Sequence, residues 1–324
     1  MPDIVGIGEL LVDFTYVSGE NGDTFYKQNA GGAPANVMCM AAKLGAKTGF
    51  IGKIGRDMFG FYLKEVLTRH KVDTSGLILD PNYSTTLAFV RNSADGDRDF
   101  VFYRSSQTSA DLNLRYGEVN RQLIDSCRIF HFGSLSLTDE PSRTATVNAV
   151  EYAKMQEKIV TYDPNWRPHL WENKETAIRT MRSAAQYADI VKVSELELQL
   201  LSDSGALIPG VAKLLQMGVK IICVTQGAKG CIIATPKGIN RFPAYKTKTV
   251  DTLGSGDGFF GAFLYKFLET GKSIEELDSD DIKEMAMFSN ACGALCASKQ
   301  GAIPAMPDMS DIETLMKSQP VKEE

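Results

Sequence analysis

Residues 251–262, DTLGSGDGFFGA, hold the side chains of this sequence with the clearest capacity for chemistry. Three small residues, Gly254 to Gly256, precede the carboxylate of Asp257, and apolar residues at helical spacing follow it. A glycine-rich turn that opens a helix presents backbone N–H groups and the positive end of the helix dipole, so it favours an anion such as phosphate. An adjacent carboxylate can take a proton from a hydroxyl that attacks phosphorus. These parts suit a kinase that acts on an alcohol, and the structural alternative is a plain loop with Asp257 as helix N-cap.

Two further segments offer groups that suit a sugar. In AGGAPAN (30–36), Gly31 and Gly32 let the backbone approach a ligand closely, and Asn36 provides both a donor and an acceptor. Asp13 ends the first strand region, and a carboxylate can accept from two adjacent hydroxyls of a polyol. A tight turn followed by a polar helix residue is the alternative interpretation of 30–36.

Cationic and polar candidates follow later strands. Asp163, Asn165 and Arg167, in the segment DPNWR, stand where a strand end leads into a cleft. Arg104 can complement Asp13 from a neighbouring β-segment, or it can be a surface residue of an edge strand.

Two segments can face a nucleotide. In KVSELE, Lys192 can contact a phosphate, and Glu197 can organise water on Mg²⁺ or lie on a helix surface as an ordinary acid. The segment TQGAKG (225–230) is a turn bracketed by glycines after a very apolar strand, and its N–H groups can meet a nucleotide.

The composition and the absence of certain motifs reduce the classes of protein to which the chain can belong. The 324 residues carry a net charge of −5 without a basic block, so we expect no nucleic-acid partner. The start lacks a basic signal region and the chain lacks a long apolar run, so we expect a cytoplasmic protein without membrane association, whose cysteines are reduced core thiols. Cys292 and Cys296 show no third ligand for a metal. The P-loop and protein-kinase motifs are absent, and Gly6-Ile7-Gly8 has Leu11 in place of the third glycine of a dinucleotide site.

Short apolar runs alternate with helical patterns, which predicts an α/β protein with a mostly parallel sheet that binds ligands at the carboxyl ends of its strands. The expected strands are 3–8, 48–52, 128–133, 158–162, 189–193, 219–224 and 230–235. The expected helices are 33–45, 57–70, 116–125, 140–156, 173–187, 194–201, 207–217, 256–270 and 281–299.

Residues 12–29 and 85–104 interrupt this alternation with short β-patterns, and Asp95-Gly96 marks a hairpin. We expect four short strands in a small separate sheet, which either closes over a substrate as a lid or only packs on the core. The α/β domain then comprises 1–11, 30–84 and 105–316, the lid 12–29 and 85–104, and the tail 317–324. Unpaired lid edges can join two subunits in a homodimer, and a monomer with a charged edge is the alternative.

Together these motifs resemble the ribokinase-like (PfkB) family of sugar kinases. The family's two patterns correspond to AGGAPANVMCMAAKLGAKTGFIGKIGRDMFG (30–60) and DTLGSGDGFFGA, and the resemblance covers about residues 3–308. Within the family the chain looks most like a fructokinase, in GELLVDF (8–14), FHFGSLSLTDEP (130–141) and YDPNWRPHLW (162–171). The resemblance implies a three-layer αβα sandwich with a mostly parallel central sheet and a small β-sheet lid.

The resemblance also implies site roles and ligands: ATP, Mg²⁺, a sugar and, in many members, K⁺. It implies that Asp257 is the general base and that the anion hole is formed by Gly254, Ser255, Gly256 and Asp257. The implied sugar contacts, with Arg167 added from its strand-end position, are Asp13, Gly31, Gly32, Asn36, Arg104 and Arg167. The implied ATP side, with Glu197 near Mg²⁺, is Lys192, Glu197, Thr225, Gly227, Gly230 and Asn290. The K⁺ site corresponds to Asp251, Leu253, Cys296, Lys299 and Gly301.

Two positions depart from the family pattern. Ser194 replaces the Asn of an Asn-x-x-Glu motif, which puts the magnesium role of position 194 in doubt, whereas Ser255 in place of Ala keeps the anion hole small. The implied reaction is ATP-dependent phosphorylation of D-fructose to fructose 6-phosphate. Alternatives are a kinase for a related substrate such as 2-keto-3-deoxygluconate, with Arg104 or Arg167 meeting its acid, and a non-catalytic sugar or nucleotide sensor.

Overall fold

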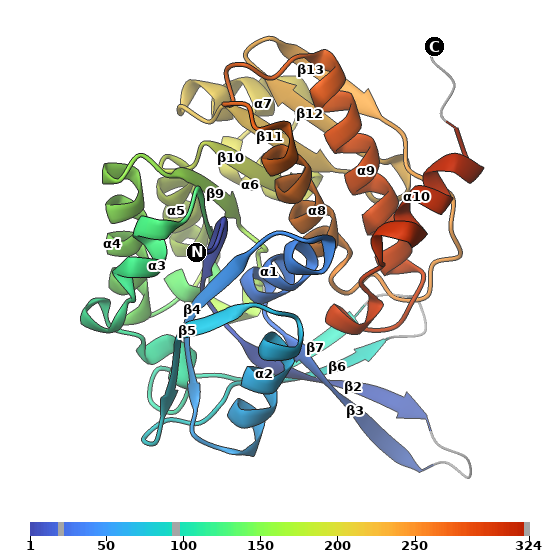
Figure 1. Ribbon diagram of the computed structural model, residues 1–324. Coiled ribbons are helices and arrows are strands. Elements are labelled where there is room, and N and C mark those ends of the chain that lie inside the picture. Colours follow the sequence, from blue (N-terminus) through green and yellow to red (C-terminus); the bar gives the residue numbers. More distant parts are fainter. Residues whose placement is uncertain (19–22, 93–97, 321–324) are drawn as a thin grey trace.

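The computed structural model describes residues 1–18, 23–92 and 98–320, and in this part of the chain nine strands form one large sheet (Figure 1). Their spatial order is β13 (Gly238–Phe242), β12 (Cys231–Thr235), β11 (Ile221–Thr225), β10 (Ile190–Ser194), β9 (Ile159–Asp163), β8 (Ile129–Gly133), β1 (Ile4–Ile7), β4 (Thr48–Gly55) and β5 (Asp73–Asp80). The pairs from β5 to β11 are parallel, and the pairs β11–β12 and β12–β13 are antiparallel. The predicted mostly parallel sheet is confirmed.

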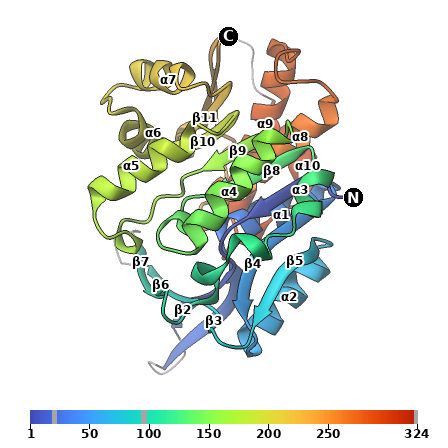
Figure 2. The same ribbon diagram turned by 90° about the vertical axis from the view of Figure 1, so that its left-hand side faces the viewer.

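The sheet separates two apolar layers, because successive side chains of a strand face opposite ways. On β1, Ile4 packs into one layer and Val5 into the other, and Ile190 and Val191 of β10 divide in the same way. The first layer is covered by α1 (Ala33–Leu44), α2 (Met58–Arg69), α8 (Ser255–Thr270), α9 (Ser279–Ala297) and α10 (Met309–Ser318). The second layer, which faces the viewer in Figure 2, is covered by α3 (Arg121–Ser126), α4 (Ser142–Met155), α5 (Lys174–Ala185), α6 (Glu195–Ser202) and α7 (Leu207–Gln216). The three-layer αβα sandwich is therefore confirmed.

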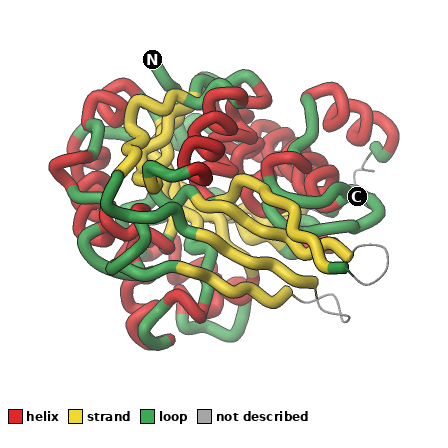
Figure 3. Tube along the Cα trace, turned by 90° about the horizontal axis from the view of Figure 1, so that it is seen from below, coloured by secondary structure: helices red, strands yellow, loops and turns green. Residues whose placement is uncertain are grey.

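A second, four-stranded sheet extends from this body (Figure 3). Its order is β3 (Thr24–Gly31), β2 (Leu11–Ser18), β6 (Leu87–Asn92) and β7 (Arg98–Tyr103). The small sheet that we expected from 12–29 and 85–104 is thus present, and its central pair, β2 and β6, is parallel. The predicted turn at Asp95-Gly96 lies outside the described residues.

Several elements differ from the sequence prediction. The helix expected over 116–125 is only half present: α3 covers its second half, and a 3-10 turn at Tyr116–Glu118 precedes it. The Glu118 carboxylate accepts from the Arg115 amide and so closes that turn. Strands β5 and β13 were not predicted, since their polar and glycine residues hide any apolar alternation. Helix α10 ends at Ser318, inside the segment expected as a tail.

The six cysteines are buried as free thiols, and burial raises the pKa of Cys39 to about 12. Among the described residues no group of three or more His, Cys, Asp and Glu side chains could hold a metal ion. No helix in the described ranges combines the length and the apolar character needed to cross a membrane.

Candidate active site

The site is built around the first turn of α8. Gly254 is the N-cap of this helix, with φ at +72°, and a Cβ there would lie 2.6 Å from Cβ of Ala302, so the position needs glycine. The Ser255 amide donates to the Thr252 carbonyl, and the Ser255 hydroxyl donates to the carbonyl of Gly293 in α9. Because the amide of Ser255 is occupied within the loop, the amides that remain at this turn for an anion are those of Gly254, Gly256 and Asp257.

Asp257 is the third residue of α8, in its first turn, and it is buried. The interpretation of Asp257 as a helix N-cap is therefore wrong, since Gly254 holds that position. The pKa of Asp257 is raised to about 6: burial and then the charge of Asp163 raise it, and Lys192, a hydrogen bond from Asn36 and the charge of Arg167 oppose the rise. A buried acid with a pKa just below neutrality suits a general base.

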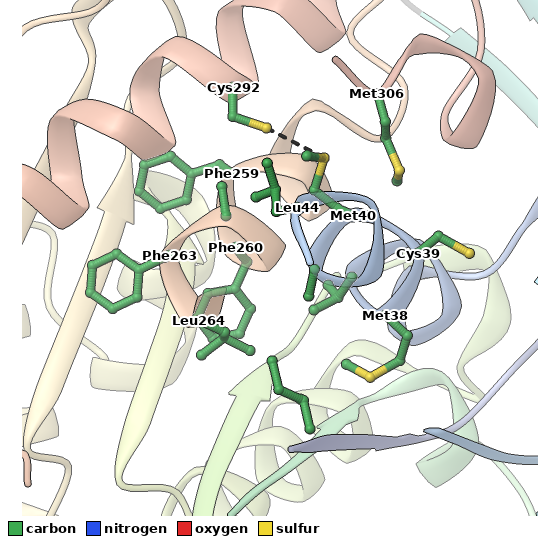
Figure 4. Packing of buried hydrophobic residues seen from close by; sticks show 14 of the residues in the cluster. Met38, Cys39, Met40, Leu44, Phe259, Phe260, Phe263, Leu264, Cys292 and Met306 are labelled. Atoms are coloured by element: carbon green, nitrogen blue, oxygen red, sulfur yellow. Dashed lines mark hydrogen bonds between the residues drawn. The ribbon is translucent and has the colours of Figure 1, made fainter. Parts of the chain in front are cut away.

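Asn36 reaches Asp257 from α1. Its Nδ2 donates to Oδ2 of Asp257 at 2.8 Å, across two segments far apart in the sequence. Figure 4 shows Met40 and Leu44 of α1 beside Phe259 and Phe260 of α8, in the packing of the two helices that carry Asn36 and Asp257. A Cβ at Gly261 would lie 2.7 Å from Cβ of Met40, so the two helices approach closely at this glycine. Close packing of α1 on α8 thus sets the geometry of the acid and its amide partner.

A pocket opens in front of Asp257, between the lid and the carboxyl ends of the large sheet. Its described lining is Glu9, Leu11, Asp13, Gly32, Ala33, Asn36, Phe102, Leu135, Asn165, Arg167, Lys192, Thr252, Leu253, Gly254, Gly256 and Asp257. The predicted sugar-side residues Asp13, Gly32, Asn36 and Arg167 therefore come together with the anion hole. Gly31 contributes indirectly, because a Cβ at that position would overlap Oδ2 of Asp13.

Arg104 lies beside this pocket and does not line it. Its Nε donates to Oδ2 of Asp111 at 2.7 Å, and its Nη1 and Nη2 donate to Oγ1 of Thr138 and the Leu135 carbonyl, both at 2.9 Å. Both members of the ion pair are almost fully buried. The guanidinium thus braces the pocket wall at Leu135, and a direct contact between Arg104 and the sugar stays a prediction.

Lys192 brings a positive charge to the anion hole from the end of β10. Its Nζ lies 2.9 Å from Oδ2 of Asp163, at the end of neighbouring β9, and both side chains are buried. Burial lowers the pKa of Lys192, but the charges of Asp163, Glu197 and Asp257 outweigh it and hold the pKa above its usual value. A Cβ at Gly256 would lie 2.9 Å from this Nζ, so the ammonium stands directly against the anion-hole turn.

Glu197 is held mainly by backbone. Its Oε1 accepts from the Trp166 amide and its Oε2 from the Ser194 amide, both at 2.8 Å, and the Ser194 hydroxyl completes a capping box at the start of α6. Ser194 therefore fills a helix-capping role in this chain. A role of Glu197 near Mg²⁺ stays a prediction, and it fits an ion that is carried mostly by the phosphates of ATP, since Mg²⁺ keeps waters and takes few protein ligands.

The remaining nucleotide-side residues lie at the neighbouring strand ends. Thr225 ends β11, and its hydroxyl contacts the Val193 carbonyl at 3.3 Å. Gly227 and Gly230 have φ of +57° and +98°, and a Cβ at Gly230 would overlap the Phe242 carbonyl. Asn290 of α9 donates to the Phe242 and Pro243 carbonyls at 3.2 and 3.0 Å. These four residues thus lie around the ends of β11 and β13, and their contact with ATP stays a prediction.

Residues 1–309 match the pfkB family of carbohydrate kinases. The chain belongs to this family. It is 43% identical over 323 residues to a probable fructokinase-5 of Arabidopsis thaliana, with 98% of each chain covered. It is 41% identical over 320 residues to fructokinase-1 of Oryza sativa subsp. japonica, which covers 97% of this chain and 98% of the relative. This pfkB-family protein is accordingly a carbohydrate kinase, a phosphotransferase that uses ATP.

Solved structures of family members share the fold. A fructokinase from Xylella fastidiosa with bound ATP has a TM-score of 0.89 at 31% identity, over 98% of this chain and 99% of that one. A fructokinase double mutant from Vibrio cholerae O395, with fructose, ADP and potassium ion bound, has a TM-score of 0.86 at 30% identity, over 97% and 98% of the two chains.

The loops expected to hold K⁺ in this pfkB kinase meet next to the anion hole. Oδ1 of Asp251 accepts from the Leu253 amide at 3.0 Å, and its Oδ2 accepts from the Gly301 amide at 2.9 Å. The Lys299 amide donates to the carbonyl of Cys296 at the end of α9. Both oxygens of the buried Asp251 carboxylate thus accept from backbone amides, which draws the loops at 253 and 301 together, and the K⁺ site itself stays a prediction.

Six lining residues were not predicted from the sequence, and Glu9 and Phe102 are two of them. Glu9 follows the first strand by the same rule that singled out Asp13, so its position at a strand end was an available signal. Phe102 sits on β7 of the lid, where nothing in its type distinguished it from the other aromatic residues of that strand.

As the predicted general base, Asp257 should give the activity a simple pH response. Proton acceptance requires the ionised form of Asp257, and its pKa of about 6 applies to the free protein. We therefore expect kcat/KM to fall about tenfold per pH unit below pH 6 and to reach a plateau above it. Initial rates from pH 5 to 8 at low sugar concentration measure this limb, and a flat profile across pH 6 would contradict the assignment.

Proposed function

We propose that the protein transfers the γ-phosphoryl group of ATP to D-fructose and forms fructose 6-phosphate. The observation that carries the proposal is the buried Asp257, held by Asn36 beside the anion-hole amides, in a pocket that also contains Asp13 and Arg167. Fructose is favoured because relatives at about 40% identity across nearly the whole chain are named fructokinases.

In the proposed reaction, Oδ1 or Oδ2 of Asp257 accepts the proton of the 6-hydroxyl as its oxygen attacks the γ-phosphorus. The amides of Gly256 and Asp257 and the ammonium of Lys192 stabilise the charge of the phosphoryl group in transfer. Mg²⁺ bound to the nucleotide would neutralise charge on the β- and γ-phosphates. Phosphoryl transfer depends mainly on positioning and electrostatic stabilisation, which these residues can provide.

A sugar panel tests the substrate. ADP release is coupled to a recorded reaction while D-fructose, related hexoses and 2-keto-3-deoxygluconate are offered with Mg·ATP. We expect the highest kcat/KM with fructose. Preferred turnover of 2-keto-3-deoxygluconate would point to Arg167, the pocket's own arginine, as the partner of its carboxylate. Binding of sugar without ADP release would instead support a sensor.

A K⁺ requirement is the next expectation. We propose that Asp251, Leu253, Cys296, Lys299 and Gly301 provide the loops of a K⁺ site, whose ion would orient the adjacent anion-hole turn. Activity in K⁺ should exceed activity in tetramethylammonium by several-fold, and Asp251→Asn should abolish the difference. Equal rates in the two salts would contradict the site.

The lid supports a proposal of a homodimer. Tyr26, Val101 and Tyr103 are 49%, 55% and 66% exposed, and Tyr26 and Tyr103 both contact the ring of Phe89. Register places them on the lid face opposite Asp13 and Phe102, so they lie outside the pocket. We expect a dimer of the full chain by light scattering, with Tyr103→Lys shifting it toward monomer. A monomer at all concentrations tested would contradict the dimer.

A further inference from the structure

Glu9 has an unusual position for a carboxylate. It lies on the short segment between β1 and β2 and lines the sugar pocket, yet the residue is only 2% exposed. Its Oε1 accepts from the Ala33 amide at 2.9 Å, which serves the start of α1, where Gly32 provides no side-chain cap. Its Oε2 is buried and has no hydrogen-bond partner among the described residues.

An unmet carboxylate oxygen is costly in such a place, because burial removes the water that would otherwise solvate it. The pKa of Glu9 is raised to about 7, mainly by burial and to a small extent by the charge of Asp111, while the backbone amide of Glu9, the charge of Arg104 and the Ala33 amide oppose the rise. Helix capping accounts for Oε1 alone. The unpaired Oε2 needs a different explanation. Glu9 lines the pocket in front of Asp257, which is the pocket that would hold a polyhydroxylated substrate.

We propose that Glu9 is a sugar-positioning residue, whose free Oε2 accepts a hydrogen bond from a hydroxyl of the bound sugar while Oε1 stays anchored on Ala33. This inference rests on the proposed function of the same pocket. The anchored oxygen fixes the carboxyl group, so the free oxygen is oriented before the sugar arrives. Together with Asp13 it provides acceptors for hydroxyls remote from the one that Asp257 deprotonates.

Glu9→Gln tests the role. The amide oxygen of Gln can still accept from Ala33, but an NH₂ group replaces the oxygen that faces the sugar. We expect KM for the sugar to rise about 10- to 100-fold, as for loss of a hydrogen bond to a charged group, with kcat within a few-fold and KM for ATP unchanged. Glu118→Gln, which removes a carboxylate that pairs with Lys53 far along the chain from this pocket, is the matched control and should leave these constants unchanged.

Deoxy analogues distinguish recognition from capping. Each analogue lacks one hydroxyl of the sugar, and one of them should lose affinity in the wild type but show no further loss in Glu9→Gln. Glu9→Asp, which is too short to reach both partners, should give the same pattern if Glu9→Gln folds poorly. Unchanged KM, or equal losses for every analogue, would overturn the assignment.

The same data separate this inference from the choice of fructose. If the wild type prefers another sugar, the fructose proposal fails, and the deoxy series is made on the preferred sugar. The KM of Glu9→Gln and the pattern across the deoxy analogues then decide whether Glu9 positions that sugar.

Discussion

Asp257→Asn is expected to lower kcat by at least about 10²-fold, within the range that general-base catalysis contributes. The amide has the shape of the carboxylate and can still accept from Nδ2 of Asn36 through its oxygen, so the close packing of α1 on α8 should persist. Sugar affinity should stay near the wild-type value, because the contacts proposed for Asp13 and the other pocket residues are untouched. Steady-state kinetics with fructose and calorimetric sugar binding measure the two quantities.

The same substitution should not destabilise the fold. Burial has raised the pKa of Asp257 from 3.8 to about 6, so the ionised form is penalised in the folded state. Its contribution to stability is complete below about pH 4 and is lost as the pH rises through 6, and at pH 7 the penalty is roughly 3 kcal/mol. Neutral Asn removes this penalty, and Tm at pH 7 should rise or stay unchanged.

A structural role and a catalytic role therefore give opposite results. A variant with near wild-type kcat would reject Asp257 as the base. A variant with low kcat and a strongly lowered Tm would indicate that the carboxylate mainly supports the fold.

Lys192→Met is expected to have the second large effect, a fall in kcat of about 10²- to 10³-fold, as for loss of one group that stabilises transition-state charge. The ammonium stands 2.9 Å from the position that a Cβ of Gly256 would take, beside the proposed path of the phosphoryl group. The variant also leaves the carboxylate of Asp163 buried without its cation, which should reduce the free energy of unfolding by about 3–5 kcal/mol.

A paired substitution separates these effects. The double variant Asp163→Asn with Lys192→Met removes both charges, so most of the lost stability should return while kcat stays low. Chemical denaturation and single-turnover kinetics measure the two responses. Recovery of kcat together with stability would show that Lys192 acts only as the partner of Asp163.

The sequence predicted the fold well where patterns are strong. The parallel strands β1, β4, β8, β9, β10 and β11 are short apolar runs with helices between them, and both features are visible without structure. Local patterns failed where tertiary contacts decide the conformation. The segment 116–125 looks helical by periodicity, yet a 3-10 turn closed by Glu118 interrupts it. Strand β5 has Ser and Gly at its centre and owes its state to pairing with β4.

The candidate site shows the same division. The glycine-rich turn at 254–257 and Asn36 stood out by residue type, and the structure joins them through one hydrogen bond. Two facts were hidden because they depend on three-dimensional neighbours. Arg104 looked free to meet a sugar, but a buried partner, Asp111, occupies its Nε. Glu9 looked like a residue of a strand end, and only burial reveals its unmatched oxygen.

The junction at Gly32 has a mechanical consequence. This residue, at φ +111°, is the single link between the end of β3 and the first residue of α1. A rotation of the lid about Gly32 would carry Asp13 and Phe102 away from the pocket. Asn36 lies on α1, which packs on α8, so it would keep its hydrogen bond to Asp257. Opening of the lid for substrate entry would therefore leave Asp257 in place, and each catalytic cycle would need only the lid residues to return to the pocket.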